Sequence, residues 1–329
     1  MIPSGVTLVQ IDNLKIHFTV RKGLFGSQLV RAVDGVSLTL RPGEVVAVVG
    51  ESGSGKTTLG RASLGLVKPT AGQVRFADRD LSAFSATDLK AYRRRAQAIF
   101  QDPFASIDPY MTIFDSVAEP LVIHKIGSAA ERRERVYQAL RDVRLTPVDE
   151  ISERYPHLLS GGQRQRAGIA RALVLQPNYI MADEPVSMVD ASSRAELLYL
   201  LRDLRDRFGI AFLYITHDIA TARHFAHRIV VMYLGRIVES GPAAAVVDNP
   251  LHPYTQALIA AVPEPDPANR LHERPVLQGE PPDPSHTPAG CAFHPRCPKF
   301  MQGTCEVAQP QLVEVEPGHY VACYLYPDA

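Results

Sequence analysis

The residues with the clearest chemical potential are Gly50 to Thr57, which have the sequence GESGSGKT and match the spacing G-x-x-x-x-G-K-[ST]. The apolar run Glu44–Val49 before them predicts a buried parallel strand, and Thr57–Leu66 after them predicts the start of a helix. A strand, a glycine-rich loop and a helix N-terminus together form an anion site, because backbone N–H groups and the helix dipole favour negative charge. We therefore predict a loop that binds the phosphates of a nucleoside triphosphate.

Each residue type in this loop suits one part of a triphosphate. Gly50, Gly53 and Gly55 allow positive φ and let the backbone approach phosphate closely. We expect Lys56 to reach the β- and γ-phosphates and the Thr57 hydroxyl to bind Mg²⁺. A plain glycine-rich turn is the alternative, which the flanking strand and helix disfavour. The residues expected to contact the nucleotide are Gly50, Glu51, Ser52, Gly53, Ser54, Gly55, Lys56, Thr57 and Thr58.

Two further apolar runs end in polar side chains of the kind that hydrolysis requires. Asn178–Asp183 predicts a buried strand that ends at Asp183 and is followed directly by Glu184. Ligands of open α/β sheets bind at the carboxyl ends of strands, where an aspartate can hold Mg²⁺ and a glutamate can polarise water. Ile210–Thr216 predicts a third strand, and His217 after it could donate a hydrogen bond to a γ-phosphate. Solvated acids and a structural histidine are the alternatives for these positions.

Gln101 and the stretch LSGGQ at residues 159–163 are weaker signals on their own. Gln101 ends the short strand predicted in Ala98–Pro103 and could bind Mg²⁺ or orient water, although a lone glutamine has many other uses. Ser160 fits the N-cap of a helix over Gln163–Leu175, whose N-terminus could face an anion. An ordinary capped helix explains the same pattern.

The N-terminal part of the chain predicts antiparallel strands close to the loop. Leu8–Val20 and Ala32–Leu40 alternate between apolar and polar residues, and Arg21–Leu29 between them predicts a glycine-containing loop. Such strands would form a small β-subdomain over the nucleotide. Phe18 could stack on the base, because an aromatic face accepts a purine, or it could face the core as an ordinary strand residue.

The remaining pattern is largely helical between residues 111 and 156, with strands and helices after it. Arg228–Gly241 predicts two strands around Gly235, which is a hairpin. The Pro-rich stretch Pro263–Pro288 predicts an extended tether. The expected helices are Ala86–Arg95, Thr112–Leu121, Glu131–Val143, Val148–Tyr155, Arg194–Phe208 and Asn249–Val262.

The bulk composition excludes several classes of protein. The 329 residues include 35 basic and 35 acidic residues, so net charge gives no argument for a nucleic-acid partner. No run of about 18 apolar residues predicts a transmembrane helix, and the N-terminus lacks the basic and apolar regions of a secretory signal. We therefore expect a soluble, cytoplasmic protein.

All four cysteines lie after residue 290, which suggests one local site. Cys291, Cys297, Cys305 and Cys323 have the spacing C-x5-C-x7-C-x17-C, which is neither a CxxC zinc pair nor a ferredoxin run. A cytoplasmic location argues against structural disulfides. An iron–sulfur cluster, a zinc site and free thiols all remain open by spacing alone.

Taken in order, these motifs resemble the ATPases of ABC transporters over residues 8 to about 245. The resemblance rests on GESGSGKT, Gln101, LSGGQ, the strand that ends in Asp183-Glu184, SMVD at residues 187–190 and His217. It implies an α/β fold with a P-loop NTPase (RecA-like) core, an antiparallel β-subdomain and an α-helical subdomain at about 104–165. Residues 1–245 would form the nucleotide-binding domain, and residues 246–329 a small cysteine-containing C-terminal extension.

The resemblance also implies that two nucleotide-binding domains pair head to tail, with each ATP between the loop of one subunit and the LSGGQ of the other. Asp190 is kept although SMVD differs from the commoner SALD, so communication between subunits is expected to survive. The implied catalytic residues are Glu184, His217 and Gln101, and the implied Mg²⁺ ligands are Thr57, Gln101 and Asp183. The further implied nucleotide contacts are Phe18, Ser160, Gly161, Gly162, Gln163 and Asp190.

The tail narrows the resemblance to the oligopeptide/dipeptide (and nickel) importer branch. NPLHPYTQALIAAVPEPDP and GEPPDPSHTPAGCAFHPRCP are similar to that branch, and LKIHFTVRKGLFG and EPVS favour the second ATPase of its heterodimeric pairs. The resemblance implies ATP, Mg²⁺ and a 4Fe–4S cluster on Cys291, Cys297, Cys305 and Cys323. The implied partners are a paralogous ATPase, two permease subunits and a substrate-binding protein, at the cytoplasmic face of the membrane.

Three other functions are alternatives to that of a peptide-transporter motor. An importer of nickel or another small solute would have the same motifs. Soluble ABC ATPases that act on nucleic acid or ribosomes usually carry two cassettes or a long coiled-coil insertion, and this chain has neither, nor a basic stripe. A cluster-bearing sensor with a vestigial cassette is disfavoured because Gln101, Glu184 and His217 are all present.

Overall fold

The computed structural model describes residues 7–22, 26–102, 106–262, 279 and 282–326. The chain forms two compact units. Unit 1 comprises Met1–Val9, Leu40–Glu44 and Phe76–Leu213, and unit 2 comprises Gln10–Thr39, Val45–Arg75 and Tyr214–Ala329. Unit 2 contains the phosphate loop, and unit 1 contains Gln101, Glu184 and LSGGQ. None of the helices in the described ranges is long and apolar enough to cross a membrane.

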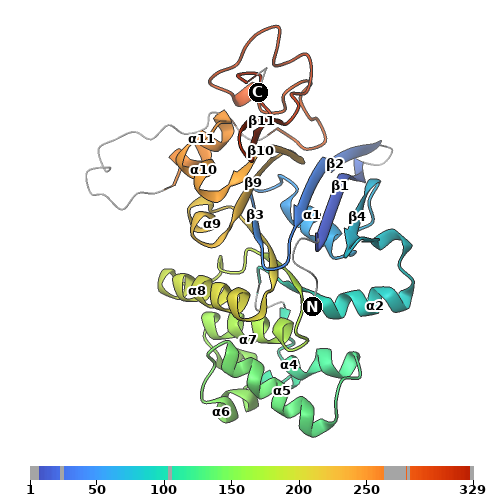
Figure 1. Cartoon of the computed structure of the whole chain (residues 1–329), viewed down its shortest axis with the longest axis vertical. Coiled ribbons are helices and arrows are strands. Elements are labelled where there is room, and N and C mark those ends of the chain that lie inside the picture. The colour runs from blue at the N-terminus through green and yellow to red at the C-terminus, as the bar shows by residue number, and fades with distance from the viewer. Residues whose placement is uncertain (1–6, 23–25, 103–105, 263–278, 280–281, 327–329) are drawn as a thin grey trace, which may run out of the picture. The chain divides into compact units, whose positions relative to one another are not determined.

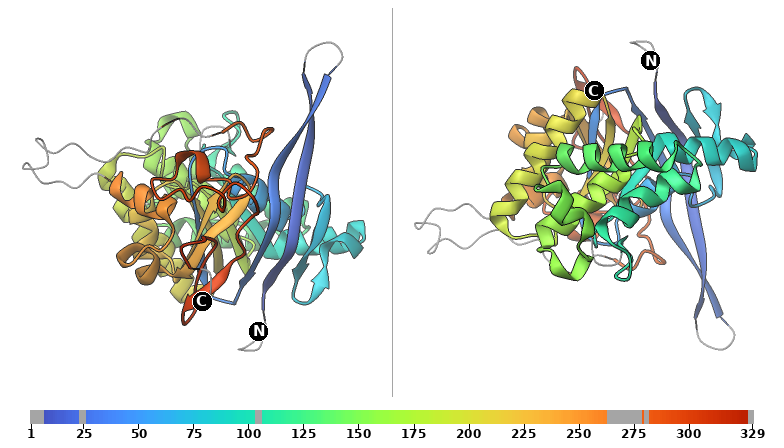
Figure 2. Two further views of the ribbon diagram at one scale, coloured as in Figure 1. Left: turned by 90° about the horizontal axis from the view of Figure 1, so that it is seen from above. Right: turned by 90° about the horizontal axis from the view of Figure 1, so that it is seen from below.

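Two long strands, β1 (Val9–Lys22) and β2 (Gly26–Leu40), lie side by side in unit 2 as a ribbon, which Figure 2 shows in dark blue. β4 (Ala71–Phe76) lies on the other side of β1. The predicted loop at Arg21–Leu29 is too long at both ends, because β1 extends to Lys22 and β2 begins at Gly26, while residues 23–25 lie outside the described residues. Pairing between the two strands extends each of them beyond the predicted ends.

The main strands of unit 2 follow the order β11-β12-β10-β9-β3. β3 pairs in parallel with β9, and all five of its residues are buried, which confirms the predicted strand before the phosphate loop. β9 and β10 form the predicted antiparallel hairpin at Gly235. β10 also pairs with β12, so two short C-terminal strands extend this sheet. The bounds are β3 (Val45–Val49), β9 (Arg228–Tyr233), β10 (Arg236–Pro242), β11 (Val313–Glu316) and β12 (His319–Val321).

The helices of unit 2 are short. The predicted helix at Asn249–Val262 is confirmed in part as α11, which begins at Pro253 because proline suits the first helical position. Most of the predicted tether at Pro263–Pro288 lies outside the described residues. The bounds are α1 (Lys56–Ser63), α9 (Ile219–Phe225), α10 (Ala243–Asp248), α11 (Pro253–Ala260) and the 3₁₀ turn η4 (His294–Arg296).

Unit 1 contains the parallel pair β6 and β7, the short β5, and the first half of β8. Its helices agree with the predicted ones to within a few residues at each end. The strands are β5 (Arg79–Asp80), β6 (Ala96–Ile99), β7 (Tyr179–Asp183) and β8 (Ala211–Thr216). The helices are α2 (Ala86–Arg95), α4 (Ile113–Ile123), α5 (Ala129–Asp142), α6 (Val148–Glu153), α7 (Gly161–Leu173) and α8 (Ala191–Phe208), with 3₁₀ turns η1 (Leu81–Ala83) and η2 (Pro156–Leu158).

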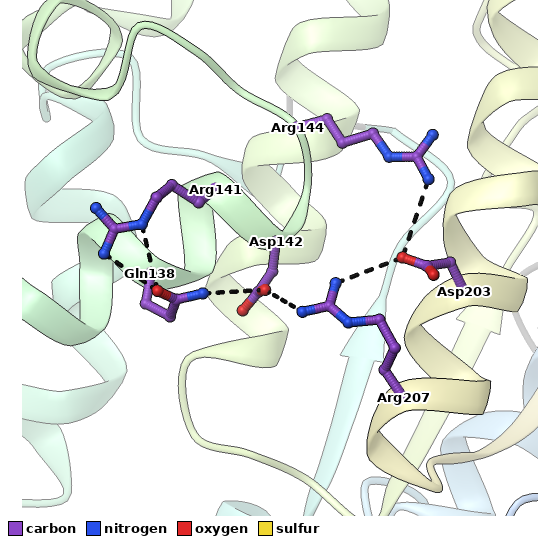
Figure 3. A network of polar contacts seen from close by, with 6 residues as sticks. All are labelled: Gln138, Arg141, Asp142, Arg144, Asp203 and Arg207. Atoms are coloured by element: carbon purple, nitrogen blue, oxygen red, sulfur yellow. Dashed lines mark hydrogen bonds and ion pairs between the residues drawn. The ribbon is translucent and has the colours of Figure 1, made fainter.

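The helices α4, α5 and α7 pack together in unit 1 around buried aliphatic side chains such as Val117, Leu121 and Leu140 (Figure 1). A polar network joins the end of α5 to α8 (Figure 3). Asp142 Oδ1 accepts hydrogen bonds from Arg207 Nη2 at 2.6 Å and from Gln138 Nε2 at 3.2 Å. These contacts fix α5 against α8, the helix that follows Asp190.

Candidate functional site

The phosphate loop has the backbone that the sequence predicts. Gly50, Gly53 and Gly55 have φ values of 152°, 80° and 98°. A Cβ atom on Gly50 would lie 2.2 Å from the Met232 carbonyl oxygen, and one on Gly55 would lie 2.0 Å from the Ala32 carbonyl oxygen. Side chains are therefore excluded at two of the three positions by space as well as by φ.

Lys56 lies inside the curve of the loop with only 6% of its surface exposed. Its Nζ donates hydrogen bonds to the carbonyl oxygens of Gly50 at 2.6 Å and Glu51 at 2.7 Å. Thr57 and Thr58 follow in the first turn of α1, whose N-cap is Gly55 and has no side chain to cap the helix. This arrangement fits phosphate, because the Lys56 ammonium and the uncapped N–H groups of α1 belong to the same loop.

A hollow of about 540 Å³ lies against the loop in unit 2. Its wall is formed by the phosphate loop, the β9–β10 hairpin and residues 282–284. The lining residues are Glu51, Ser52, Gly53, Ser54, Tyr233, Leu234, Pro282, Asp283 and Pro284.

In unit 1, the carboxyl end of β7 brings two predicted catalytic residues together. Asp183 ends the strand and is buried, and Glu184 follows it with φ of 45°, which is rare for a residue other than glycine. Gln101 Nε2 donates a hydrogen bond to Glu184 Oε2 at 3.0 Å. Backbone strain of this kind concentrates at functional sites. At Glu184 it coincides with the hydrogen bond from Gln101.

LSGGQ forms the start of α7, as predicted. Ser160 is the N-cap, its Oγ accepts from the Gln163 N–H at 3.3 Å, and Gln163 Oε1 accepts from the Ser160 N–H at 3.0 Å. Gly161 and Gly162 occupy the first turn, and a Cβ on Gly162 would lie 3.4 Å from Ser193 Oγ. The Gln163 N–H is occupied by this cap, and at Gly161 and Gly162 there is no side chain to cover the N–H groups.

Asp190 caps α8 rather than standing alone. Its Oδ1 accepts from the Ser193 N–H at 2.9 Å, and its Oδ2 accepts from Ser193 Oγ at 2.8 Å. Hydrogen bonds from Ser192 and Ser193 hold the pKa of this carboxyl well below its usual range. Asp190 therefore stays ionised, and its hydrogen bonds hold the first turn of α8.

His217 and Phe18 are both accessible in unit 2. His217 follows β8 and is exposed, and the next residue, Asp218, caps α9 by accepting from the N–H groups of Ala220 and Thr221. Phe18 lies on β1 and is 41% exposed. Exposure suits the predicted contacts with phosphate and base, and both roles remain predictions.

The four cysteines are free thiols, of which Cys305 is buried and the others are half-buried. Cys291 N–H donates to the Cys305 carbonyl oxygen at 2.7 Å. Burial, reinforced by the neighbouring cysteines, raises the pKa of the Cys291 thiol to about 11. Among the described residues, no three His, Cys, Asp or Glu side chains are arranged to hold a single metal ion.

Sequence analysis missed two residues that contact the phosphate loop. Tyr254 of α11 accepts a hydrogen bond from the Glu51 N–H, and Arg296 of η4 forms an ion pair with the Glu51 carboxylate. Both lie in stretches that carry the resemblance, NPLHPYT and FHPRCP. No local sequence pattern predicts their contact with Glu51, which lies 203 residues before Tyr254 and 245 before Arg296.

His252, the N-cap of α11, is predicted to make the protein acid-sensitive. It is fully buried, its Nδ1 accepts from the Tyr254 N–H, and burial lowers its pKa to about 3. Because the unfolded histidine binds a proton near its ordinary pKa and the folded one does not, stability is lost as the pH falls from about 6.5. Between about pH 7.5 and about pH 5 this loss is about 2 kcal/mol.

The variant His252→Asn keeps a capping oxygen and is expected to abolish most of that pH-dependent loss in urea unfolding at the two pH values. His286→Asn, at an exposed histidine, is the matched control and should leave the loss unchanged. An equal loss in His252→Asn and in the parent protein would contradict the assignment.

Comparison with known proteins agrees with this geometry. Residues 33–187 match the family model described as ABC transporter, and residues 238–305 match that of the oligopeptide/dipeptide transporter C-terminal region. A putative peptide import ATP-binding protein of Brucella ovis is 48% identical over 316 residues, covering 96% of this chain and 97% of that protein. The oligopeptide transport ATP-binding protein AppF of Bacillus subtilis is 45% identical over 324 residues, covering 97% and 98%.

Solved structures share the fold. CbiO1 of Clostridium perfringens, part of the ABC transporter complex cbiONQ, has a TM-score of 0.64 at 25% identity and covers 74% of this chain and 92% of its own. The ATP-binding cassette MJ0796, solved as a dimer bound to ADP and Pi, has a TM-score of 0.63 at 30% identity and covers 72% and 99%. The chain thus belongs to the ABC transporter ATP-binding proteins, in the branch that carries the oligopeptide/dipeptide transporter C-terminal region.

Proposed function

We propose that this chain hydrolyses ATP to drive the uptake of di- and oligopeptides through membrane permease subunits. The observation that carries the catalytic part is the 3.0 Å hydrogen bond between Gln101 Nε2 and Glu184 Oε2 at the end of β7. The relatives named for peptide import, which match nearly the whole chain, support the cargo. Nickel or another small solute remains the alternative cargo.

The residues of the chain account for each step around the nucleotide. Bound ATP supplies the phosphoanhydride bond that water attacks. Glu184 polarises that water and accepts its proton, while Gln101 holds the glutamate and the water in line. His217 donates a hydrogen bond to the developing charge on the γ-phosphate. The proposed Mg²⁺ ligands are Thr57, Gln101 and Asp183, because Mg²⁺ prefers oxygen donors of these types.

We further propose that two ATPase subunits pair head to tail, this chain with a paralogue. The related cassette MJ0796 forms a dimer, which supports pairing. The residues that would contact ATP on the partner subunit are Ser160 and its neighbours Gly161, Gly162 and Gln163, whose helix N-terminus favours an anion. Asp190, ordered by Ser192 and Ser193, would lie at the same interface.

The permease contact is proposed to lie in unit 1 beside Gln101. A pocket of about 240 Å³ there is lined by residues that include Phe100, Ile123, His124 and Leu175, and both Phe100 and Ile123 are exposed. The lining combines these apolar side chains with charged ones such as Arg93 and Arg171, which suits an amphipathic helix of a membrane subunit. Binding to the permease subunits would hold the chain at the cytoplasmic face of the membrane. The substrate-binding protein would bind the permeases on the opposite face.

For the cysteines we propose a 4Fe–4S cluster bound by Cys291, Cys297, Cys305 and Cys323. The other three cysteines contribute to the raised pKa of the Cys291 thiol, and four thiols fit a cluster in type and number, although they are not arranged around a single ion. Anaerobically purified protein should absorb near 400 nm and contain iron, and Cys297→Ser should lose both. Colourless, iron-free protein would contradict the cluster without affecting the ATPase proposal.

The function is tested by coexpressing this chain with the permease subunits of a peptide importer and preparing membrane vesicles from the cells. ATP-dependent uptake of a labelled tripeptide is expected, and co-purification of the permeases with this chain should accompany it. Uptake of nickel with no peptide uptake would favour the alternative cargo. An absence of any permease in the purified complex would contradict the transporter role.

A further inference from the structure

An ion pair joins the C-terminal segment, residues 282–326, to Glu51 of the phosphate loop. Arg296 Nη1 lies 2.8 Å from Glu51 Oε2, and its Nη2 lies 3.1 Å from Glu51 Oε1. Such a two-point contact is the strongest geometry available to arginine and a carboxylate. The arginine side chain is 5% exposed, so water weakens this pair little.

A second contact from the same segment fixes the backbone at Glu51. The Glu51 N–H donates to Tyr254 Oη at 2.8 Å, and the Glu51 carbonyl oxygen accepts from Lys56 Nζ at 2.7 Å. Tyr254 packs in turn against Tyr233 and Phe293, with ring centroids 4.7 and 5.4 Å away. The second residue of the loop is therefore held by the C-terminal segment through both its backbone and its side chain.

The charge of Glu51 explains why such a contact matters for nucleotide. A carboxylate in the phosphate loop opposes the approach of a triphosphate, because like charges repel most strongly where water is partly excluded. The guanidinium of Arg296 cancels that charge. Hydrogen bonding to Glu51 raises the pKa of Arg296 above its usual range, so it stays charged at every physiological pH.

We propose that Arg296 is a positioning residue of the ATP site, which neutralises Glu51 and holds the phosphate loop in its nucleotide-accepting conformation. The residue lies in η4, between Cys291 and Cys297. The cysteine-rich segment thereby sets the affinity of the loop for nucleotide. This inference rests on ATP binding by the loop and is independent of the cargo.

The test compares two variants that break the same ion pair from opposite sides. In full-length protein, the affinity for a fluorescent ATP analogue with Mg²⁺ is measured by titration. Arg296→Gln leaves an unpaired carboxylate in the loop and is expected to weaken binding about tenfold or more. Glu51→Gln removes the repelling carboxylate and leaves the guanidinium unpaired, so it is expected to bind the analogue more tightly than the parent protein. The double variant should return to within about threefold of the parent.

A merely structural contact gives a different pattern, because both single variants remove the same bond. Equal weakening in Arg296→Gln and Glu51→Gln, or no recovery in the double variant, would overturn the proposal. Should Arg296→Gln unfold, Arg296→Lys replaces it, since lysine keeps the charge and loses the two-point geometry. That variant must then bind more weakly than the parent, and binding at the parent's affinity would overturn the proposed geometry.

A matched control is the ion pair between Arg223 of α9 and Asp248 of α10. Arg223 also contacts its partner at two points, at 3.0 and 2.7 Å, and lies in the same unit without touching the loop. Arg223→Gln should leave nucleotide affinity unchanged. Thermal unfolding of all variants separates loss of affinity from loss of folded protein.

Discussion

Replacing Glu184 by glutamine is expected to reduce the rate of ATP hydrolysis by about 100-fold or more while ATP binding is retained. A positioned general base contributes about 10² to 10⁴ in rate, and the amide cannot accept the proton of the attacking water. Glutamine still offers an oxygen to Gln101 Nε2, which donates to Glu184 at 3.0 Å, so the local structure should persist. Phosphate release measures the rate, and gel filtration should show ATP-bound dimers accumulating.

The matched control for this prediction is Glu196→Gln. Glu196 is another acid of unit 1, exposed on α8 and paired with Arg166 at 2.8 Å. Its replacement should leave hydrolysis within about twofold of the parent, because exposed ion pairs contribute little. Hydrolysis by Glu184→Gln at the parent's rate would contradict the assigned role of Glu184 and the mechanism proposed for the site.

Features that depend on neighbouring residues were predictable from the sequence. The glycine spacing predicted positive φ at Gly50, Gly53 and Gly55, and the serine and glutamine of LSGGQ, three residues apart, predicted a capped helix. The order of motifs likewise predicted that Gln101 and Glu184 serve one site, and a hydrogen bond joins them. The loop glycines and the helix cap are determined by the local chain, whereas Gln101 and Glu184 lie 83 residues apart and were assigned to one site through the family resemblance.

Features that depend on distant partners were not predictable in this way. β11 and β12 are only four and three residues long, and β12 exists as a strand because Val321 and Tyr320 pair with Glu239 and Ser240 of β10. The contact between Glu51 and Arg296 spans 245 residues. No periodicity or spacing in the sequence reports such a pairing, which arises only when the chain folds.

Replacing Gly55 by alanine is expected to lower the free energy of unfolding by about 2 to 5 kcal/mol and to abolish nucleotide binding. An alanine at φ of 98° is strained by about 1 to 2 kcal/mol. Its Cβ would also lie 2.0 Å from the Ala32 carbonyl oxygen, and the backbone shift needed to relieve that contact costs about 1 to 3 kcal/mol more. Urea unfolding and titration with ADP measure the two effects.

Gly53→Ala separates space from backbone strain, because Gly53 also has positive φ, 80°, but a Cβ there meets no atom within 4 Å. This control should lose only about 1 to 2 kcal/mol. The difference in unfolding free energy between the two variants measures the steric cost of the close approach between the Ala32 carbonyl of β2 and the N-terminus of α1. Equal destabilisation by the two substitutions would mean that β2 does not press on the phosphate loop, and the fit of the loop to phosphate would then depend on φ alone.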